Sequence, residues 1–235
     1  MIPLRDTQEI KIFPIATIAI IAVNTMVLIL MQISSARAAD PSLWLESFYL
    51  RYGLVPYEIM TGDIIYPSIR PVFLTLFTSI FLHGGWSHLI GNMLYLWIFG
   101  NNVEDYLGTF GFIAFYLAGG IAATFAHIAS APASQVPVVG ASGAIAGVMG
   151  AYFYLFPHAR VRTLVLVFYF VTFVEIPAYF FLFIWFIMQL SSAFTSFGSA
   201  SGVAFWAHVG GFVFGFLVAL LVKKLKHGRE RSEYF

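Results

Sequence analysis

The chain has 235 residues, of which 60% are hydrophobic and 10% are charged, with a formal net charge of +1. About a quarter of the residues in soluble domains are charged, so this composition indicates a protein built for a lipid bilayer. The sequence has no cysteine, which excludes disulfides and thiolate nucleophiles, and its basic residues form no stripe that would follow a nucleic-acid backbone.

Hydropathy divides the chain into six predicted transmembrane helices within one membrane domain, residues 1–235. The first apolar run is long enough to cross a hydrocarbon core of ~30 Å and longer than the apolar region of a signal peptide. Cleavage after the ARAAD stretch that follows it is the alternative. In chain order we expect a span at 12–33, an external loop at 34–83, spans at 84–103, 110–129, 139–156, 176–192 and 203–222, and a cytoplasmic tail at 223–235.

The apolar run from Thr163 to Leu190 is too long for one upright helix and too short for two. Glu175 and Pro177 interrupt it. We therefore begin the fifth span at residue 176 and expect residues 163–175 to lie at the membrane interface or to dip into it. The predicted fold class is an all-α polytopic membrane protein.

Basic residues are concentrated on one side of the predicted spans. With the N-terminus inside, nine of the twelve Lys and Arg residues fall in cytoplasmic segments. The other three, Arg37, Arg51 and Arg70, lie in the long first external loop. The positive-inside rule therefore predicts that both termini are cytoplasmic, and we expect a multi-pass protein of the cell membrane.

Four polar side chains fall near the external ends of three predicted spans. His88 and Asn92 lie early in the second span, Ser142 early in the fourth and His208 early in the sixth. Strongly polar residues are costly in hydrocarbon and mark functional sites by default. The alternating directions of the spans place all four side chains at one depth, which hydropathy alone does not require.

These residue types fit nucleophilic catalysis. A serine hydroxyl becomes a nucleophile when a base takes its proton, and His208 is the candidate base for Ser142. Ser142 lies at a predicted helix N-terminus, where free backbone N–H groups and the helix dipole stabilise a developing oxyanion. His88 and Asn92 are spaced i, i+4, so they share one helix face and add side-chain donors.

Small residues predict close contact between the fourth and sixth spans. Gly143 and Gly147 form one GxxxG pattern, and Gly211 and Gly215 form another. Such faces let helix backbones approach closely. If the two faces meet, the serine and the histidine are carried to adjacent positions.

Three motifs together resemble the rhomboid intramembrane serine proteases over roughly residues 70–222: HGGWSHLIGN in the second span, GASG in the fourth and AHVGGFVFG in the sixth. The resemblance implies a six-helix rhomboid-like bundle. It implies that Ser142 is the nucleophile and His208 its base, in a dyad without an acidic third member. It further implies an oxyanion hole formed by His88, Asn92 and the backbone N–H of Ser142.

The resemblance also implies substrates and supporting residues. The substrates would be membrane-anchored proteins, cut within or next to a transmembrane helix without a metal or cofactor. His83 would match a structural histidine and Glu104 a glutamate after the second span. Leu74-Thr75 stand where many members carry Trp-Arg, and Ala146 stands where some bacterial members place a tyrosine that stacks on the catalytic histidine.

Two other classes of function stay open. A catalytically inactive rhomboid-like protein that binds transmembrane clients would share the fold, although the presence of both Ser142 and His208 favours a protease. A transporter would need a midplane site, usually with internal repeats, and the polar residues cluster near one surface instead.

Overall fold

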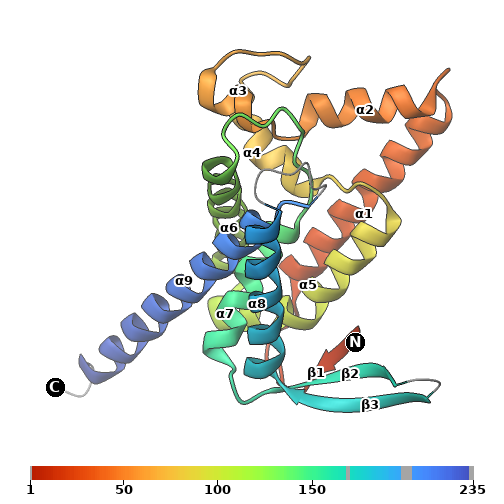
Figure 1. Ribbon diagram of the computed structural model, residues 1–235. Coiled ribbons are helices and arrows are strands. Elements are labelled where there is room, and N and C mark those ends of the chain that lie inside the picture. The colour runs from red at the N-terminus through yellow and green to blue at the C-terminus, as the bar shows by residue number, and fades with distance from the viewer. Residues whose placement is uncertain (1, 168–169, 197–202, 233–235) are drawn as a thin grey trace.

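The structure is a computed structural model that describes residues 2–167, 170–196 and 203–232. Most of the described chain is helical, and each predicted span falls on one helix of a bundle (Figure 1). The bundle helices are α1 (Ile15–Ala36), α5 (Trp86–Leu107), α6 (Thr109–Ser130), α7 (Ser142–Leu155), α8 (Ala178–Thr195) and α9 (Phe205–Ser232). The Gly/Ser-rich loop predicted before the last span lies almost entirely outside the described residues.

Four helices of the described chain are long and apolar enough to cross a membrane, namely α1, α6, α8 and the part of α9 up to Lys226. α7 is apolar but has only 14 residues. At 1.5 Å per residue its length is about 21 Å, which is shorter than a hydrocarbon core of ~30 Å. α5 has 22 residues, but its last two turns carry two asparagines, a glutamate and an aspartate.

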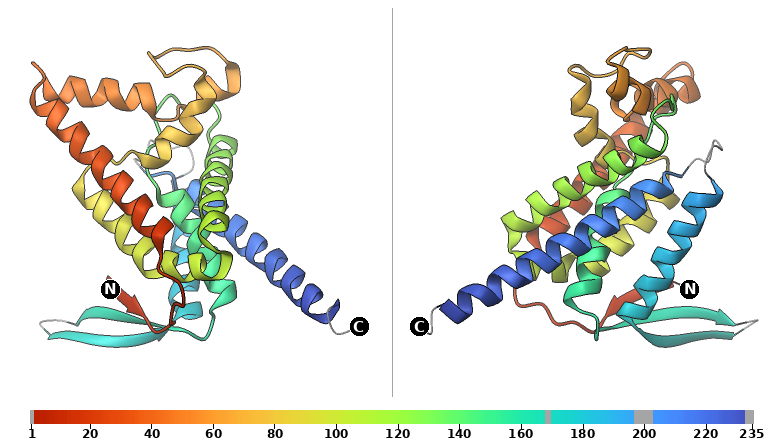
Figure 2. Two further views of the ribbon diagram at one scale, coloured as in Figure 1. Left: turned by 180° about the vertical axis from the view of Figure 1, so that it is seen from behind. Right: turned by 60° about the vertical axis from the view of Figure 1, so that its left-hand side comes forward.

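The short helix α7 lies in the middle of the bundle, next to α5, α6 and α9 (Figure 2). Every residue from Gly143 to Tyr152 is buried. The helix therefore presents no lipid-facing stripe over this length, and its small side chains let the neighbouring helices surround it. Ser142 is its first residue.

Glycines bring α7 and α9 into backbone contact. A Cβ atom built on Gly211 would lie 2.1 Å from the carbonyl oxygen of Gly143, and one built on Gly215 would lie 1.8 Å from that of Gly147. Only glycine fits at these two positions of α9. In α7, a Cβ on Gly150 would likewise lie 2.0 Å from the Phe212 carbonyl oxygen of α9. The two GxxxG glycines of α7 differ, because a Cβ on Gly147 would lie 3.4 Å from the Gly211 oxygen, an ordinary contact, and one on Gly143 would strike Ala123 of α6 at 2.6 Å.

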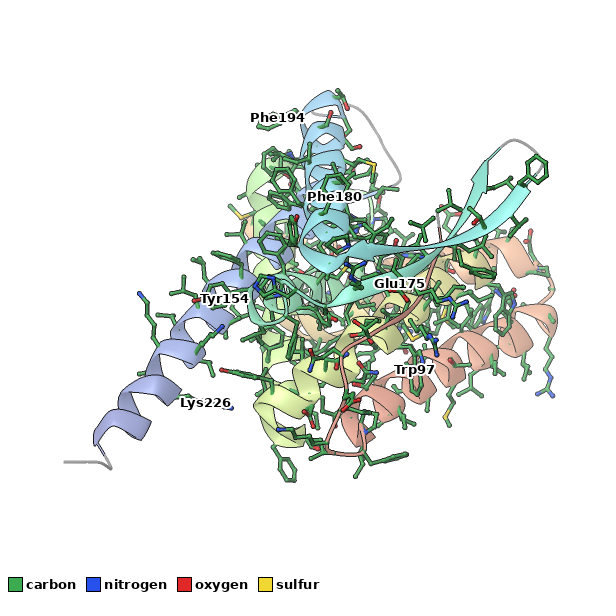
Figure 3. All side chains as sticks on the ribbon, turned by 90° about the horizontal axis from the view of Figure 1, so that it is seen from below. Trp97, Tyr154, Glu175, Phe180, Phe194 and Lys226 are labelled. Carbon is green, nitrogen blue, oxygen red and sulfur yellow. The ribbon has the colours of Figure 1, made fainter. Side chains whose placement is uncertain are left out.

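The prediction of an all-α fold is wrong in one respect, because the structure also contains a three-stranded antiparallel sheet. β1 (Ile2–Asp6) pairs with β2 (Arg160–Val167), which pairs with β3 (Phe170–Pro177). Residues 163–167 and 170–175 thus lie on two paired strands, with Glu175 on β3 (Figure 3). The segment is rich in β-branched and aromatic residues, which favour strands, and hydropathy does not distinguish an apolar strand from an apolar helix.

The region predicted as an external loop, 34–83, is folded. It contains α2 (Pro41–Tyr52), α3 (Pro56–Thr61), α4 (Thr75–Thr78) and the 3-10 turns Val72–Leu74 and Ser79–Phe81. Asp40 caps α2 by accepting hydrogen bonds from the backbone N–H groups of Ser42 and Leu43. This region lies at one end of the bundle, whereas the sheet and the C-terminal end of α9 lie at the other (Figure 1).

Glu104 of α5 caps the N-terminus of α1, a helix far from it in the sequence. The first turn of α1 follows Pro14, which has no side-chain acceptor for the free N–H groups of that turn. The fully buried carboxylate of Glu104 accepts from the N–H of Ala16, and from the N–H and hydroxyl of Thr17, each at 2.8 Å. Glu104 therefore joins α5 to the start of α1.

A second polar cluster holds the N-terminal strand to the bundle. The Asp6 carboxylate at the end of β1 accepts hydrogen bonds from the hydroxyl of Tyr152 on α7 and from Nδ2 of Asn102 on α5. Burial raises the pKa of Asp6 above its ordinary value, and the hydrogen bonds partly oppose this shift. The sheet is thus fixed to α5 and α7 at the end of the bundle opposite Ser142.

Candidate active site

The serine and the histidine predicted to form a pair are in hydrogen-bond contact. Ser142 Oγ lies 2.8 Å from His208 Nε2. Ser142 begins α7, and His208 lies in the first turn of α9, so both side chains come from the same ends of two helices in backbone contact. The distance is that of an ordinary O–H···N hydrogen bond, which a base needs in order to take the serine proton.

The other ring nitrogen of His208 also has a partner. His208 Nδ1 lies 2.8 Å from Oε1 of Gln189 on α8. The ring centroid of Trp185, one turn earlier on α8, is 6.0 Å from that of His208 with the planes inclined by 37°. The sequence analysis missed both residues, although one amide within an otherwise apolar span was a signal, because such groups are costly in a membrane.

A cavity of about 990 Å³ opens onto this pair. Its wall includes Ser142, His208, His88, Asn92 and Gln189. Nδ2 of Asn92 is buried and has no hydrogen-bond partner among the described residues. A buried donor left without an acceptor is costly, and a ligand oxygen in the cavity is the kind of group that would satisfy it.

Backbone donors face the same region. Ser142, Gly143 and the following residue form the first turn of α7, where N–H groups have no acceptor within the helix. The residue before them is Ala141, which has no side-chain acceptor, and the helix has no side-chain cap. These N–H groups and the helix dipole make the start of α7 favourable for a negative charge.

Gly140 makes room for His88. Its φ of +133° is a conformation that other residues rarely adopt, and a Cβ atom there would lie 3.0 Å from His88 Nε2 and 3.7 Å from Ser142 Oγ. The His88 ring therefore reaches the segment that precedes the serine. Its Nδ1 accepts a long hydrogen bond of 3.3 Å from the N–H of Gly84.

Two further histidines, His83 and His127, lie near this site. His83 is fully buried, its ring meets that of His88 edge-on at 5.0 Å, and its carbonyl accepts from the hydroxyl of Tyr49. Burial, with some repulsion from His88, lowers the pKa of His83 to about 4. Burial thus favours a neutral His83 ring packed against His88, and its structural role stays a prediction. His127 of α6 lines the cavity.

The structure also describes the positions that depart from the rhomboid pattern. Ala146 is fully buried in α7, so no aromatic ring extends from it to His208. Trp185 and Phe205 place their rings about the histidine instead, and the Phe205 centroid is 6.2 Å away with perpendicular planes. Leu74 and Thr75 form the junction between a 3-10 turn and α4.

The arrangement has the components of acyl-transfer chemistry. It joins a hydroxyl to an imidazole and provides backbone N–H groups and an amide that face one cavity. An oxyanion that forms beside Ser142 would meet donors already in place.

Comparisons with known proteins identify the family to which the chain is similar. The family model of the Rhomboid domain matches residues 70–225. Rhomboid protein 1, mitochondrial, of Saccharomyces cerevisiae is 31% identical over 147 residues, which are 61% of this chain and 37% of the yeast protein. Rhomboid protease GluP of Bacillus subtilis is 44% identical over 80 residues, which are 34% of this chain and 15% of GluP.

A further relative is presenilin-associated rhomboid-like protein A, mitochondrial, of Danio rerio. It is 29% identical over 149 residues, which cover 63% of this chain and 34% of the fish protein. The chain thus matches well under two thirds of the length of each of these relatives. Because the family model matches more than half of the chain, this membrane protein belongs to the Rhomboid family.

Proposed function

We propose that this chain is an intramembrane serine endopeptidase that cleaves membrane-anchored proteins within or next to a transmembrane helix. The observation that carries the proposal is the 2.8 Å contact between Ser142 Oγ and His208 Nε2 at the wall of a cavity that also contains the unpartnered amide of Asn92. Membership of the Rhomboid family, whose members act on membrane proteins within the bilayer, supports the class of substrate.

The mechanism follows from the groups around the serine. His208 Nε2 takes the hydroxyl proton as Ser142 Oγ attacks the scissile carbonyl carbon. The backbone N–H of Ser142, with the side chains of His88 and Asn92, donates to the resulting oxyanion. The imidazolium then returns the proton to the leaving amine, which breaks the C–N bond and leaves an acyl-serine. A water molecule, activated by the same imidazole, hydrolyses the acyl-serine and regenerates the enzyme.

We further propose that α1, α5, α6, α7, α8 and α9 all occupy the bilayer, with the sheet end facing the cytoplasm of a cell-membrane protein. The basic residues Lys223, Lys224 and Lys226 of α9 are at that end, as the positive-inside rule requires. α7 is about 9 Å shorter than the hydrocarbon core. If its inner end is level with the sheet, Ser142 lies below the outer membrane surface, and the cavity supplies its water.

A cleavage assay in liposomes tests the proposal. The purified protein is reconstituted with a labelled single-span reporter, and cleavage by the parent is compared with cleavage by the Ser142→Ala variant. We expect the variant to lose cleavage entirely. Cleavage by Ser142→Ala at the parental rate would refute the assignment, whereas a parent that binds the reporter without cutting it would favour an inactive client-binding protein.

A second experiment addresses the serine without a substrate. A fluorophosphonate probe should label Ser142 in the parent and fail to label the His208→Ala variant, because the reagent reacts with serines that a base activates. Addition of EDTA should leave labelling and cleavage unchanged. Loss of cleavage on chelation would indicate a metal-dependent enzyme.

A further inference from the structure

Gln189 links a third helix to the serine–histidine pair. Its side chain projects from α8, a helix of which only Ala178, Leu182 and Ala193 are buried. Two hydrogen-bond contacts of 2.8 Å run in series, one between His208 Nδ1 and Gln189 Oε1 and one between Ser142 Oγ and His208 Nε2. Three helices thus contribute one residue each to a continuous polar chain.

A hydrogen bond at one imidazole nitrogen determines what the other nitrogen does. The amide oxygen of Gln189 only accepts, so Nδ1 must carry the proton in this contact. Neutral imidazole has one N–H, so Nε2 then has a free lone pair directed at the serine hydroxyl. This is the tautomer in which His208 accepts the serine proton, and the opposite tautomer would donate to Ser142 and leave it inactive.

From these contacts we propose that Gln189 is a positioning residue that orients His208 and selects its reactive tautomer. The inference rests on the proposed function, in which His208 is the base for Ser142. Gln189 takes the place that an acidic side chain occupies in a three-residue serine–histidine–acid site. It touches neither the serine nor the substrate carbonyl, and it acts through the imidazole.

An amide suits this place better than a carboxylate because the site lies among membrane helices. An ionised carboxylate there would carry a desolvation cost during the whole resting state. The amide oxygen provides the orienting acceptor without a permanent charge. The titratable groups whose charge acts on His208 are His88 of α5 and His127 of α6, and neither supplies a negative charge.

The aromatic residues of α8 and α9 support the same orientation. Trp185 lies one turn before Gln189, with its ring plane inclined by 37° to that of His208, and Phe205 meets the imidazole edge-on. These rings restrict tilting of the imidazole, but they do not distinguish its two nitrogens. Selection of the tautomer therefore falls to the amide.

The test compares Gln189→Leu and Gln189→Glu with the parent in the liposome assay. Leucine keeps the bulk and removes the acceptor, so we expect kcat to fall by about 10- to 100-fold with little change in KM. Glutamate restores an acceptor and favours the protonated imidazole. We therefore expect it to recover most of the cleavage at alkaline pH and to move the acid limb of the pH–kcat/KM profile to higher pH.

A matched control separates positioning from stability. Met188 is adjacent on α8 and half exposed, so Met188→Leu should reproduce the parental rate and pH profile. All variants are compared by thermal unfolding, and we expect Gln189→Leu to unfold at the parental temperature. The labelling rate with the fluorophosphonate probe should fall in parallel with kcat in Gln189→Leu, which measures the activation of Ser142 independently of reporter binding.

Two results would overturn the inference. Parental kcat and an unchanged pH profile in both Gln189 variants would show that the amide does not position His208. Faster cleavage by Gln189→Leu would show that the amide donates to Nδ1 and holds the unreactive tautomer. Either result would leave the proposed protease intact if Ser142→Ala is inactive in the same assay, whereas cleavage by Ser142→Ala would refute the proposed function itself.

Discussion

Replacement of Gly211 by alanine should separate the serine from the histidine without altering either residue. The added Cβ would lie 2.1 Å from the Gly143 carbonyl oxygen, so α9 must retreat by about 1.3 Å to reach an ordinary contact of 3.4 Å. Gly143 follows Ser142, and Gly211 lies less than one turn beyond His208. A retreat of this size lengthens the 2.8 Å contact between Ser142 Oγ and His208 Nε2 to about 4 Å, beyond hydrogen-bond range.

We expect cleavage to fall by about 10²-fold or more in Gly211→Ala, because a misplacement of about 1 Å has that effect on a catalytic group. Overpacking should also cost about 1–3 kcal/mol of stability. The control is Gly147→Ala in the same interface, where the Cβ meets its nearest neighbour at an ordinary 3.4 Å. This variant should keep parental activity and gain about 0.5–1 kcal/mol from its helix propensity.

The assay is reporter cleavage in liposomes, with thermal unfolding in detergent as the measure of stability. Gly211→Ala must be compared at a temperature at which it remains folded. Equal activity in Gly211→Ala and Gly147→Ala would refute the reasoning, because the helix separation would then not determine the distance between the two catalytic groups.

Three further predictions concern other parts of the chain. Asn92→Ala should lower kcat about 10²- to 10³-fold with KM nearly unchanged if the Asn92 amide donates a hydrogen bond to the oxyanion. A change in KM alone would indicate that Asn92 binds the substrate instead. Glu104→Ala should lower the free energy of unfolding, measured in detergent, by about 1–3 kcal/mol, because two N–H groups of α1 lose their acceptor. Unchanged stability would contradict the capping role. Burial raises the pKa of Asp6 in the folded state, which therefore favours the protonated acid. The contribution of Asp6 to stability is complete below its ordinary pKa and is lost as pH rises through the raised one. Thermal stability should therefore depend less on pH above that ordinary value in Asp6→Asn than in the parent, and equal slopes would refute this.

The polar chemistry of the site was accessible from the sequence because a membrane makes such residues conspicuous. Ser142 and His208 stood out among apolar neighbours, and the alternation of span directions placed them at one depth. Gln189 satisfied the same criterion and was missed, since no motif surrounds it. That its amide meets the far side of the imidazole depends on how α8 is rotated, which hydropathy does not specify.

Sequence patterns were insufficient to predict the β-hairpin and the contacts that each glycine of α7 and α9 makes. Residues 163–175 are almost uniformly apolar, so neither a period of 2 nor one of 3.6 was visible, and only length argued against a second span. The GxxxG patterns predicted that α7 and α9 meet. They did not predict which glycines meet a carbonyl of the other helix, namely Gly211 and Gly215 of α9 and Gly150 of α7, because that depends on the rotation of each helix about its axis.

The backbone contact between α7 and α9 affects how the active site responds to the composition of the bilayer. At Gly211 and Gly215 the contact is between main-chain atoms, which have no rotamers to exchange when lipid composition or lateral pressure changes. A side-chain interface would adapt to such changes by repacking and would shift the helices as it did so. The serine–histidine distance should thus remain constant in bilayers of different composition, and the exposed face of α9 is free to diverge in sequence without a loss of alignment.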